Sequence, residues 1–272
     1  MKLTIYQVDA FSSELFGGNP AAVVPLDTWL PDDTMLAIAA ENNLSETAFF
    51  VEDGDDYHIR WFTPTIEVNL CGHATLASAH VIFNELQLED ALIRFHSNRS
   101  GKLPVQRRQD SIVLDFPAYA ITEIEPSDAL ALALGVVPVK SWSSVNNGVL
   151  VRLNTEQDVR DLKPDFNALA QLEYERIYVT APGETCDFAS RMFAPKIGIA
   201  EDPVTGAMHC TLIPYWASEL GKNKLLARQV SKRGGELSCE FFGDRVKIGG
   251  NAVTYLKGEI YVEAGSGKSV GA

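Results

Sequence analysis

The chain has 272 residues, enough to bury a large core and close to the length at which one core usually divides into two. Its 23 Lys and Arg against 36 Asp and Glu give a formal net charge of −13, which argues against nucleic acid or an anionic membrane as a partner. The four cysteines are widely spaced and form no CxxC pair, so neither a zinc site nor a disulfide framework is predicted. No apolar run is long enough to span a bilayer, and the first residues do not resemble a signal peptide, so we expect a cytoplasmic protein.

Strands and two helices alternate along the first half of the chain. The predicted elements are strands at 2–11 and 21–26 around a turn at Gly17-Gly-Asn-Pro20, a helix capped by Asp32 or Asp33 that ends at Asn42-Asn43, strands at 47–51 and 58–62, a second helix from about residue 72, and strands at 92–96 and 112–116.

The helix from about Gly72 is apolar on every side. Apolar residues recur from Ala74 to Leu86 and leave no polar stripe, and such a helix lies inside a protein. Its first turn must then be buried as well, and the unpaired N–H groups there favour a bound anion or carboxylate. Gly72 would let a ligand approach the backbone, with Cys71 and His73 on either side. Each of these two side chains could instead be a packed structural group.

Three short patterns recur in the same order farther along the chain. They are Pro-Asp-x-x-x-Leu-Ala from Pro31 and Pro164 (offset 133), Arg-x-Phe-x-Pro-x-Ile from Arg60 and Arg191 (offset 131), and Gly-x-Leu from Gly101 and Gly235 (offset 134). We therefore expect two copies of one unit, at 1–117 and 127–250, joined between Pro117 and Pro126. Strands around one buried helix in each half are typical of an α+β fold.

The second copy is predicted to start its own buried helix near Pro203. Asp-Pro is a favourable helix start, with Asp202 as the N-cap and Pro203 in the first turn. An offset of 131 places Asp202 opposite Cys71. Asp202 could cap the helix, contact a ligand, or do both.

The C-terminal residues 251–272 are predicted to form a hairpin that returns to the first half. Its strands are expected at 252–256 and 259–262 about Lys257-Gly258. The tripeptide Gly267-Lys268-Ser269 lacks both the first glycine and the following helix of a phosphate-binding P-loop, so no nucleotide site is predicted.

Glu46 stands where the first helix gives way to an apolar strand. Burial at this place would raise the pKa of its carboxyl group toward the range useful for proton transfer. A glutamate in such a turn could equally be a solvated surface residue.

Seven ordered motifs carry a family resemblance that spans about residues 9–258. They are Gly17-Gly-Asn-Pro-Ala-Ala-Val23, Asn43-Leu-Ser-Glu-Thr-Ala48, Arg60-Trp-Phe-Thr-Pro64, Leu70-Cys-Gly-His-Ala-Thr-Leu76, Phe193-Ala-Pro195, Glu201-Asp-Pro-Val-Thr-Gly206 and Arg233-Gly-Gly235. Together they resemble the signatures of the PhzF (phenazine biosynthesis-like) isomerases. The resemblance implies the diaminopimelate epimerase-like fold: two pseudo-symmetric domains, each a curved, mostly antiparallel sheet wrapped around a central helix, with the active site in the cleft between them. It also implies a homodimer.

The same resemblance implies an activity without a cofactor, and no metal site is predicted. A proton would move between carbons of a small carboxylate or amino-acid-like substrate, with Glu46 as the general acid/base and His73 and Asp202 holding and polarising the substrate. The remaining substrate-binding positions would be Cys71, Gly72, Thr205, Gly206 and Ala207.

Two positions depart from the phenazine enzyme. That enzyme has Thr-Gly-Ser where this chain has Thr205-Gly-Ala207, which removes a hydroxyl group and argues against the phenazine substrate. It has Ala-Gly-His where this chain has Cys71-Gly-His73, and the thiol falls where diaminopimelate epimerases keep a catalytic cysteine. A two-base epimerase or racemase using Cys71, and a catalytically silent binding or scaffold protein, therefore stay as alternatives.

Overall fold

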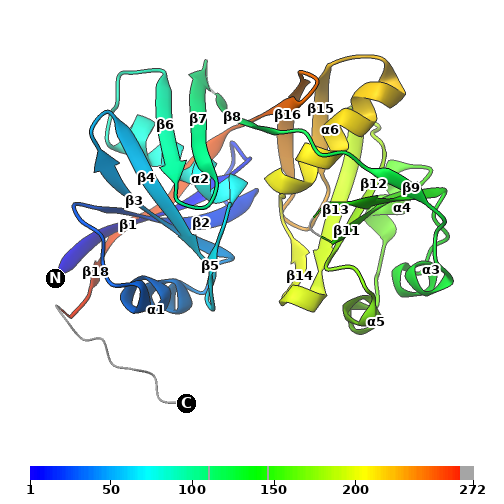
Figure 1. Ribbon diagram of the computed structural model, residues 1–272, viewed down its shortest axis with the longest axis horizontal. Helices are drawn as coiled ribbons and strands as arrows, with labels where there is room; N and C mark the ends of the chain where they lie inside the picture. Colours follow the sequence, from blue (N-terminus) through cyan, green and yellow to red (C-terminus); the bar gives the residue numbers. More distant parts are fainter. Residues whose placement is uncertain (110, 146, 264–272) are drawn as a thin grey trace. The chain divides into compact units, whose positions relative to one another are not determined.

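The computed structural model describes residues 1–109, 111–145 and 147–263, which form two compact units (Figure 1). The first unit comprises residues 1–16, 20–114 and those from 250 onward, and the second comprises 17–19 and 115–249. The Gly267-Lys268-Ser269 tripeptide and the end of the predicted C-terminal hairpin lie outside the described residues.

The first unit contains one central helix, α2, surrounded by strands, and one outer helix, α1 (Figure 1). Its elements are β1 (Lys2–Ala10), β2 (Asn19–Leu26), α1 (Asp32–Asn42), β3 (Glu46–Asp53), β4 (Asp56–Phe62), β5 (Glu67–Val68), α2 (Gly72–His80), the π-helical turn η1 (Val81–Glu85), β6 (Leu92–Ser97), β7 (Gly101–Arg108), β8 (Ser111–Pro117) and β18 (Ala252–Tyr261).

The second unit has the central helix α6 and three short outer helices. Its elements are β9 (Thr122–Ile124), α3 (Asp128–Leu134), β10 (Lys140–Ser144), β11 (Gly148–Arg152), α4 (Glu156–Asp161), α5 (Phe166–Gln171), β12 (Arg176–Pro182), β13 (Phe188–Ala194), the 3-10 turn η2 (Pro195–Ile197), β14 (Ile199–Asp202), α6 (Gly206–Leu220), β15 (Lys224–Gln229), β16 (Gly235–Phe241) and β17 (Arg245–Gly250).

The two units repeat one pattern of strand pairing. In the first, β2 and β3 are parallel, β3 and β4 antiparallel, β4 and β5 antiparallel, β4 and β6 parallel, and β6 and β7 antiparallel. In the second, β11 and β12, β12 and β13, β13 and β14, β13 and β15, and β15 and β16 pair in the same order and directions. The predicted α+β fold with two pseudo-symmetric, mostly antiparallel units is confirmed.

A repeated ion pair reveals how the two halves align in sequence. Arg60 on β4 forms a bidentate pair with Glu67 on β5, at 2.8 and 2.9 Å, and Arg191 on β13 does the same with Glu201 on β14, at 2.7 and 2.9 Å. The arginines are 131 positions apart and the glutamates 134. The offset changes because the connection containing η2 is three residues longer than its counterpart.

This change of offset corrects the predicted equivalence of Asp202 and Cys71. Val68 pairs with Trp61 on β4, and Asp202 pairs with Met192 at the equivalent position on β13, so Asp202 corresponds to Val68. Cys71 is the N-cap residue of α2, and its counterpart is Thr205, the N-cap residue of α6.

Both central helices are buried, as their sequences predict. All nine residues of α2 are buried, and the helix packs against β1, β3 and β18. The helical run continues beyond His80 only as the π-helical turn η1, with Leu86 at its C-cap.

The helix α6 begins at Gly206, three residues later than predicted, and Asp202 is not its N-cap. Asp202 is the last residue of β14 and lies in extended pairing with β13. The side chain of Gln229 accepts a hydrogen bond from the Thr205 N–H (2.7 Å) and donates one to the Asp202 carbonyl (2.7 Å). These bonds occupy the backbone groups that an earlier helical turn would use, so residues 202–205 stay extended.

The predicted cap of α1 is also wrong. Pro31 takes the N-cap position, and no side chain caps the helix. Asp32 is instead the first helical residue, and its carboxylate accepts a hydrogen bond from Arg60 at 2.9 Å. The predicted end of α1 is correct, since Asn43 adopts the left-handed conformation (φ 49°) that terminates the helix.

The predicted C-terminal hairpin is a single strand. β18 pairs antiparallel with β1 along its whole length, and Lys257 and Gly258 lie opposite Tyr6 and Ile5 without a reversal. The pattern Lys-Gly indicates a turn only where no partner strand is available, and β1 supplies a partner of matching length. No helix among residues 1–109, 111–145 and 147–263 combines the length and the apolar character that crossing a membrane requires.

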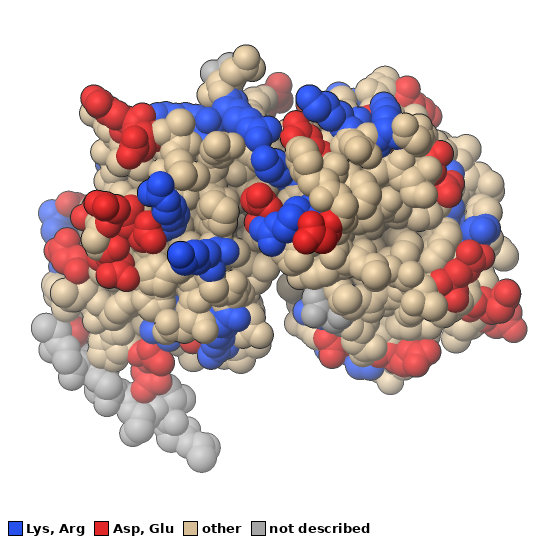
Figure 2. Space-filling view, turned by 45° about the horizontal axis from the view of Figure 1, so that its top comes forward, with Lys and Arg blue, Asp and Glu red and all other residues tan. Residues whose placement is uncertain are grey.

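Acidic and basic side chains are interspersed over the face drawn in Figure 2, rather than separated into one basic and one acidic surface.

Candidate active site

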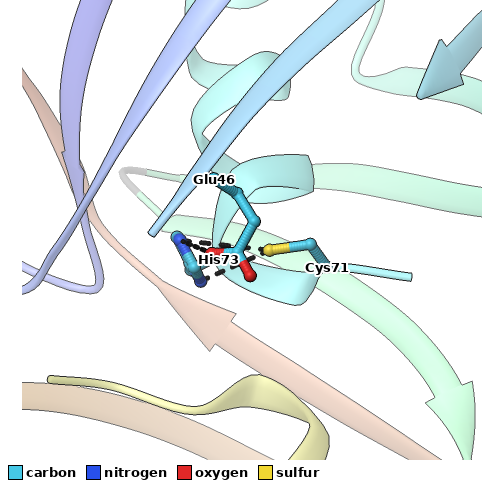
Figure 3. Close-up of side chains that lie close together, drawn as sticks. All are labelled: Glu46, Cys71 and His73. Atoms are coloured by element: carbon cyan, nitrogen blue, oxygen red, sulfur yellow. Dashed lines mark hydrogen bonds and ion pairs between the residues drawn. The ribbon is translucent and has the colours of Figure 1, made fainter. Parts of the chain in front are cut away.

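Glu46, Cys71 and His73 converge in the first unit from two elements (Figure 3). Glu46 is the first residue of β3, Cys71 is the N-cap of α2, and His73 is in the first turn of α2. The Glu46 Oε2 atom lies 3.2 Å from His73 Nε2, and the Cys71 Sγ atom lies 3.4 Å from His73 Nδ1. The carboxyl group and the thiol therefore both contact the imidazole and also lie close to each other, within 4.8 Å.

The three side chains are largely removed from solvent. The side chains of His73 and Glu46 are 5% and 13% exposed, and Cys71 is 7% exposed. Burial lowers the pKa of His73 to about 3, so its imidazole is neutral at neutral pH. A neutral imidazole offers one N–H donor and one acceptor nitrogen. It can therefore bond to the carboxyl group through Nε2 and to the thiol through Nδ1.

The first turn of α2 is not capped by a side chain. The Cys71 carbonyl accepts hydrogen bonds from both the N–H (3.1 Å) and the hydroxyl (2.6 Å) of Thr75, while the Cys71 thiol is directed at His73. The N–H groups of a helix start without a capping side chain attract an anion, and the helix dipole adds to this attraction. The predicted position of Gly72 at this helix start is correct.

Loop contacts hold the segment that leads into α2. Arg99 donates to the Asn69 side chain (3.1 Å) and to the Glu67 carbonyl (3.3 Å), and the Ser100 hydroxyl donates to the Asn69 carbonyl (2.6 Å). The β6–β7 connection therefore sets the position of Cys71. The sequence motifs around Cys71 do not include this connection.

Asp202 and Thr205 lie together in the second unit. Burial raises the pKa of Asp202 to about 6, although hydrogen bonds from Thr205 (2.5 Å) and Asn19 (2.7 Å) favour its charged form. The Thr205 hydroxyl is used by Asp202 and does not cap α6. Gly206 and Ala207 open the helix immediately after it, so α6, like α2, starts without a side-chain cap.

Three polar residues of this second group were missed by sequence reasoning. Asn19 was interpreted only as part of a turn, yet it donates to Asp202 and to the Val204 carbonyl (2.9 Å). Gln229 carries no motif at all. His209 donates through Nδ1 to the Thr205 carbonyl at 2.8 Å, in the position that Thr75 holds in the first unit.

Comparisons with known proteins agree with this architecture. The sequence model of one family, described as phenazine biosynthesis-like protein, matches residues 8–258. A Pseudomonas aeruginosa protein named as an uncharacterized isomerase is 52% identical over 260 residues, which cover 96% of this chain and 99% of that protein. The crystal structure of an Enterococcus faecalis PhzF-family protein superposes with a TM-score of 0.93 at 45% identity, covering 96% of this chain and all of the other.

A more distant structure shares the fold alone. A hydroxyproline epimerase from Agrobacterium vitis, solved with bound trans-4-hydroxy-L-proline, has a TM-score of 0.61 at 11% identity over 95% of this chain and 92% of its own.

The fold, the residues gathered at the start of α2 and the isomerases among the relatives define an enzyme of the isomerase class. The chain belongs to the phenazine biosynthesis-like family.

Proposed function

We propose that this isomerase moves a proton between carbons of a small carboxylate or amino-acid-like substrate without a cofactor, with Glu46 as the general acid/base. The observation that supports this most is the 3.2 Å contact between the Glu46 carboxyl group and the buried, neutral imidazole of His73 at the uncapped start of α2. A carboxyl group held in one orientation and largely shielded from water suits the transfer of a proton to and from carbon.

In this proposal the proton leaves a carbon next to the substrate carboxylate and goes to Glu46. The substrate then carries enolate-like charge, which the N–H groups and the dipole of α2 stabilise. Glu46 returns the proton to another carbon. His73 donates its Nε2–H to Glu46 and accepts the Cys71 S–H at Nδ1, so the ring fixes the orientation of both neighbours.

Asp202, Thr205, Gly206 and Ala207 are proposed to bind substrate groups other than the reacting carbon. The raised pKa of Asp202 supports this role, because a buried carboxyl group near its protonation midpoint can donate or accept a hydrogen bond. The hydroxyl of Thr205 donates to Asp202 and so helps to orient that carboxyl group.

A two-base epimerase is the second candidate function. The 3.4 Å distance from Cys71 Sγ to His73 Nδ1 supports it, because this contact holds the thiol at the uncapped start of α2, where the helix dipole favours the thiolate that would act on carbon. Cys71 would then be catalytic, and an acid other than Glu46 would be its partner.

Substitutions separate the two candidates once a substrate is found. We would incubate the protein in deuterated water with a panel of small amino and hydroxy acids and follow loss of C–H signals by proton NMR.

Glu46→Gln keeps the side-chain shape but removes the acid/base, and we expect a loss of about 10²- to 10⁴-fold in rate. Cys71→Ser should cost little. If Cys71→Ser abolishes turnover and Glu46→Gln leaves it nearly intact, the epimerase replaces the one-base enzyme.

The origin of the transferred proton gives an independent test. A single carboxyl group that lifts and returns the proton should leave part of the original hydrogen in the product formed in deuterated water. A second base that has equilibrated with solvent would deliver deuterium from the first turnover. Mass spectrometry of product from single-turnover reactions distinguishes these outcomes.

A further inference from the structure

The same three side chains have the geometry of a metal site. One ligand atom from each of Glu46, Cys71 and His73 lies within 4.8 Å of the other two. From His73 Nε2 the distance is 3.2 Å to Glu46 Oε2 and 3.9 Å to Cys71 Sγ. A tetrahedral Zn²⁺ with bonds of about 2.0 to 2.3 Å places neighbouring ligand atoms about 3.3 to 3.6 Å apart. The Glu46–Cys71 pair is bounded by the 4.8 Å limit, so bringing all three atoms onto such a tetrahedron takes side-chain movements of up to about an ångström.

The types of ligand atom select the ion. A thiolate, an imidazole and a carboxylate form a set that suits Zn²⁺, whereas Mg²⁺ and Ca²⁺ prefer oxygen ligands throughout. Three protein ligands leave the fourth position of the tetrahedron to water or to a carboxylate, as in zinc sites that stay open. The helix start next to Cys71 favours an anion at that fourth position.

We propose that Cys71, His73 and Glu46 together bind one Zn²⁺ ion, and that the bound ion inhibits the enzyme. Cys71 Sγ, His73 Nε2 and one Glu46 oxygen coordinate the ion. On binding, the thiol proton passes to solvent, the ring proton moves from Nε2 to Nδ1 by exchange with solvent so that Nε2 can coordinate, and no electron is transferred. This site departs from the sequence-based expectation of no metal. That expectation rested on cysteine spacing, whereas Glu46 lies 25 positions before Cys71 and reaches it only through the fold.

The proposed inhibition by Zn²⁺ rests on the proposed function, but the proposed binding of Zn²⁺ does not. A zinc-bound Glu46 cannot accept a proton, so the ion would stop any reaction that uses this carboxyl group as its base. Binding is measurable without a substrate, so it can fail or succeed independently of the isomerase proposal.

Co²⁺ is the spectroscopic probe for this site. A thiolate bound to Co²⁺ gives an intense charge-transfer absorption in the near ultraviolet. We expect this band to saturate at one equivalent of Co²⁺ and to disappear when one equivalent of Zn²⁺ is added. The Cys71→Ser variant should lack the band, and Glu46→Gln and His73→Gln should each weaken Zn²⁺ binding by at least about tenfold, because even residues that only orient a ligand contribute about 10- to 100-fold to metal affinity.

Cys186 provides the matched control. It is only half-buried, belongs to the second unit, and donates a hydrogen bond to the Phe188 carbonyl at 3.2 Å. Cys186→Ser should keep the full charge-transfer band. Circular dichroism of each variant would show that a lost band does not reflect a lost fold.

The outcomes are distinct. A band that persists in Cys71→Ser, that vanishes in Cys186→Ser, or that never forms at one equivalent overturns the metal site, even if isomerase activity is found. If the band depends on Cys71 but Zn²⁺ does not reduce turnover, the metal-binding site is supported. The proposed inhibition and the role of Glu46 as the base are then both overturned. Loss of turnover with saturating Zn²⁺, restored by a chelator, is the expected result.

Discussion

The carboxyl group of Asp202 is buried, and burial disfavours its charged form. Burial raises its pKa from about 3.8 to about 6. Between these pH values the folded protein holds a proton that the unfolded chain has lost, so the stability contributed by this group falls as pH rises through the window. A shift of this size corresponds to roughly 3 kcal/mol in the free energy of unfolding.

We predict that the change in the free energy of unfolding caused by Asp202→Asn, relative to the wild type, is more stabilising at pH 8 than at pH 4.5. The amide cannot ionise, and it can still accept from Asn19 and meet the Thr205 hydroxyl. Urea denaturation at both pH values measures the two differences in free energy of unfolding. The histidines with lowered pKa values, such as His209, oppose this trend, but they are common to both proteins and cancel in the comparison. Equal differences at both pH values would contradict the prediction.

The sequence located part of the site at residue scale. Cys71 and His73 are two positions apart at a recognisable helix start, and Glu46 stands at a recognisable helix-to-strand boundary. The capping role of Asp202 is wrong because the backbone there depends on Gln229, whose side chain holds residues 202–205 from 24 to 27 positions away. No local pattern marks such a residue, since any strand can carry a glutamine.

At the scale of elements, the burial of α2 should dominate the stability of the first unit. Leu76 is 0% exposed, and we predict that Leu76→Ala lowers the free energy of unfolding by about 2 to 5 kcal/mol, because it removes packing and leaves a cavity. Leu132 on α3 is 83% exposed, so Leu132→Ala should change it by less than about 0.5 kcal/mol. Chemical denaturation of both variants tests the contrast. Similar losses would mean that α2 is not the core of its unit.

Two glycines test whether residues 252–261 form one strand or a hairpin. Gly258 has an extended backbone within β18, and an added Cβ would meet only Leu256 at an ordinary 3.5 Å, so Gly258→Ala should be neutral or stabilise by up to about 1 kcal/mol. Gly135 ends α3 in the left-handed conformation (φ 72°), so Gly135→Ala should destabilise by about 1 kcal/mol. Thermal melts compare the two. A loss at Gly258 equal to that at Gly135 would favour the hairpin.

At the scale of the whole molecule, the repeat was visible in the sequence but its alignment was not. The Arg-x-Phe-x-Pro-x-Ile pattern ends at Ile197, the last residue of η2, with offset 131, and the Gly-x-Leu pattern follows with offset 134, so neither pattern alone shows that three residues are added between them. Residues after the η2 connection are therefore aligned correctly with their counterparts in the first unit only by the offset of 134. Predicted equivalences between two copies of a unit hold within uninterrupted segments and fail across an insertion.

The pairing of β1 with β18 also determines the order in which the units can be completed during synthesis. The ribosome makes β1 first, but its partner β18 follows residue 249, after nearly all of the second unit has emerged. The nascent chain must therefore carry an incomplete first unit, with one edge of β1 unpaired, while the second unit is already complete. Unpaired edges attract other strands. We predict that a chain ending at Gly250 aggregates and that a separate peptide of residues 251–263 restores its solubility, which light scattering would measure.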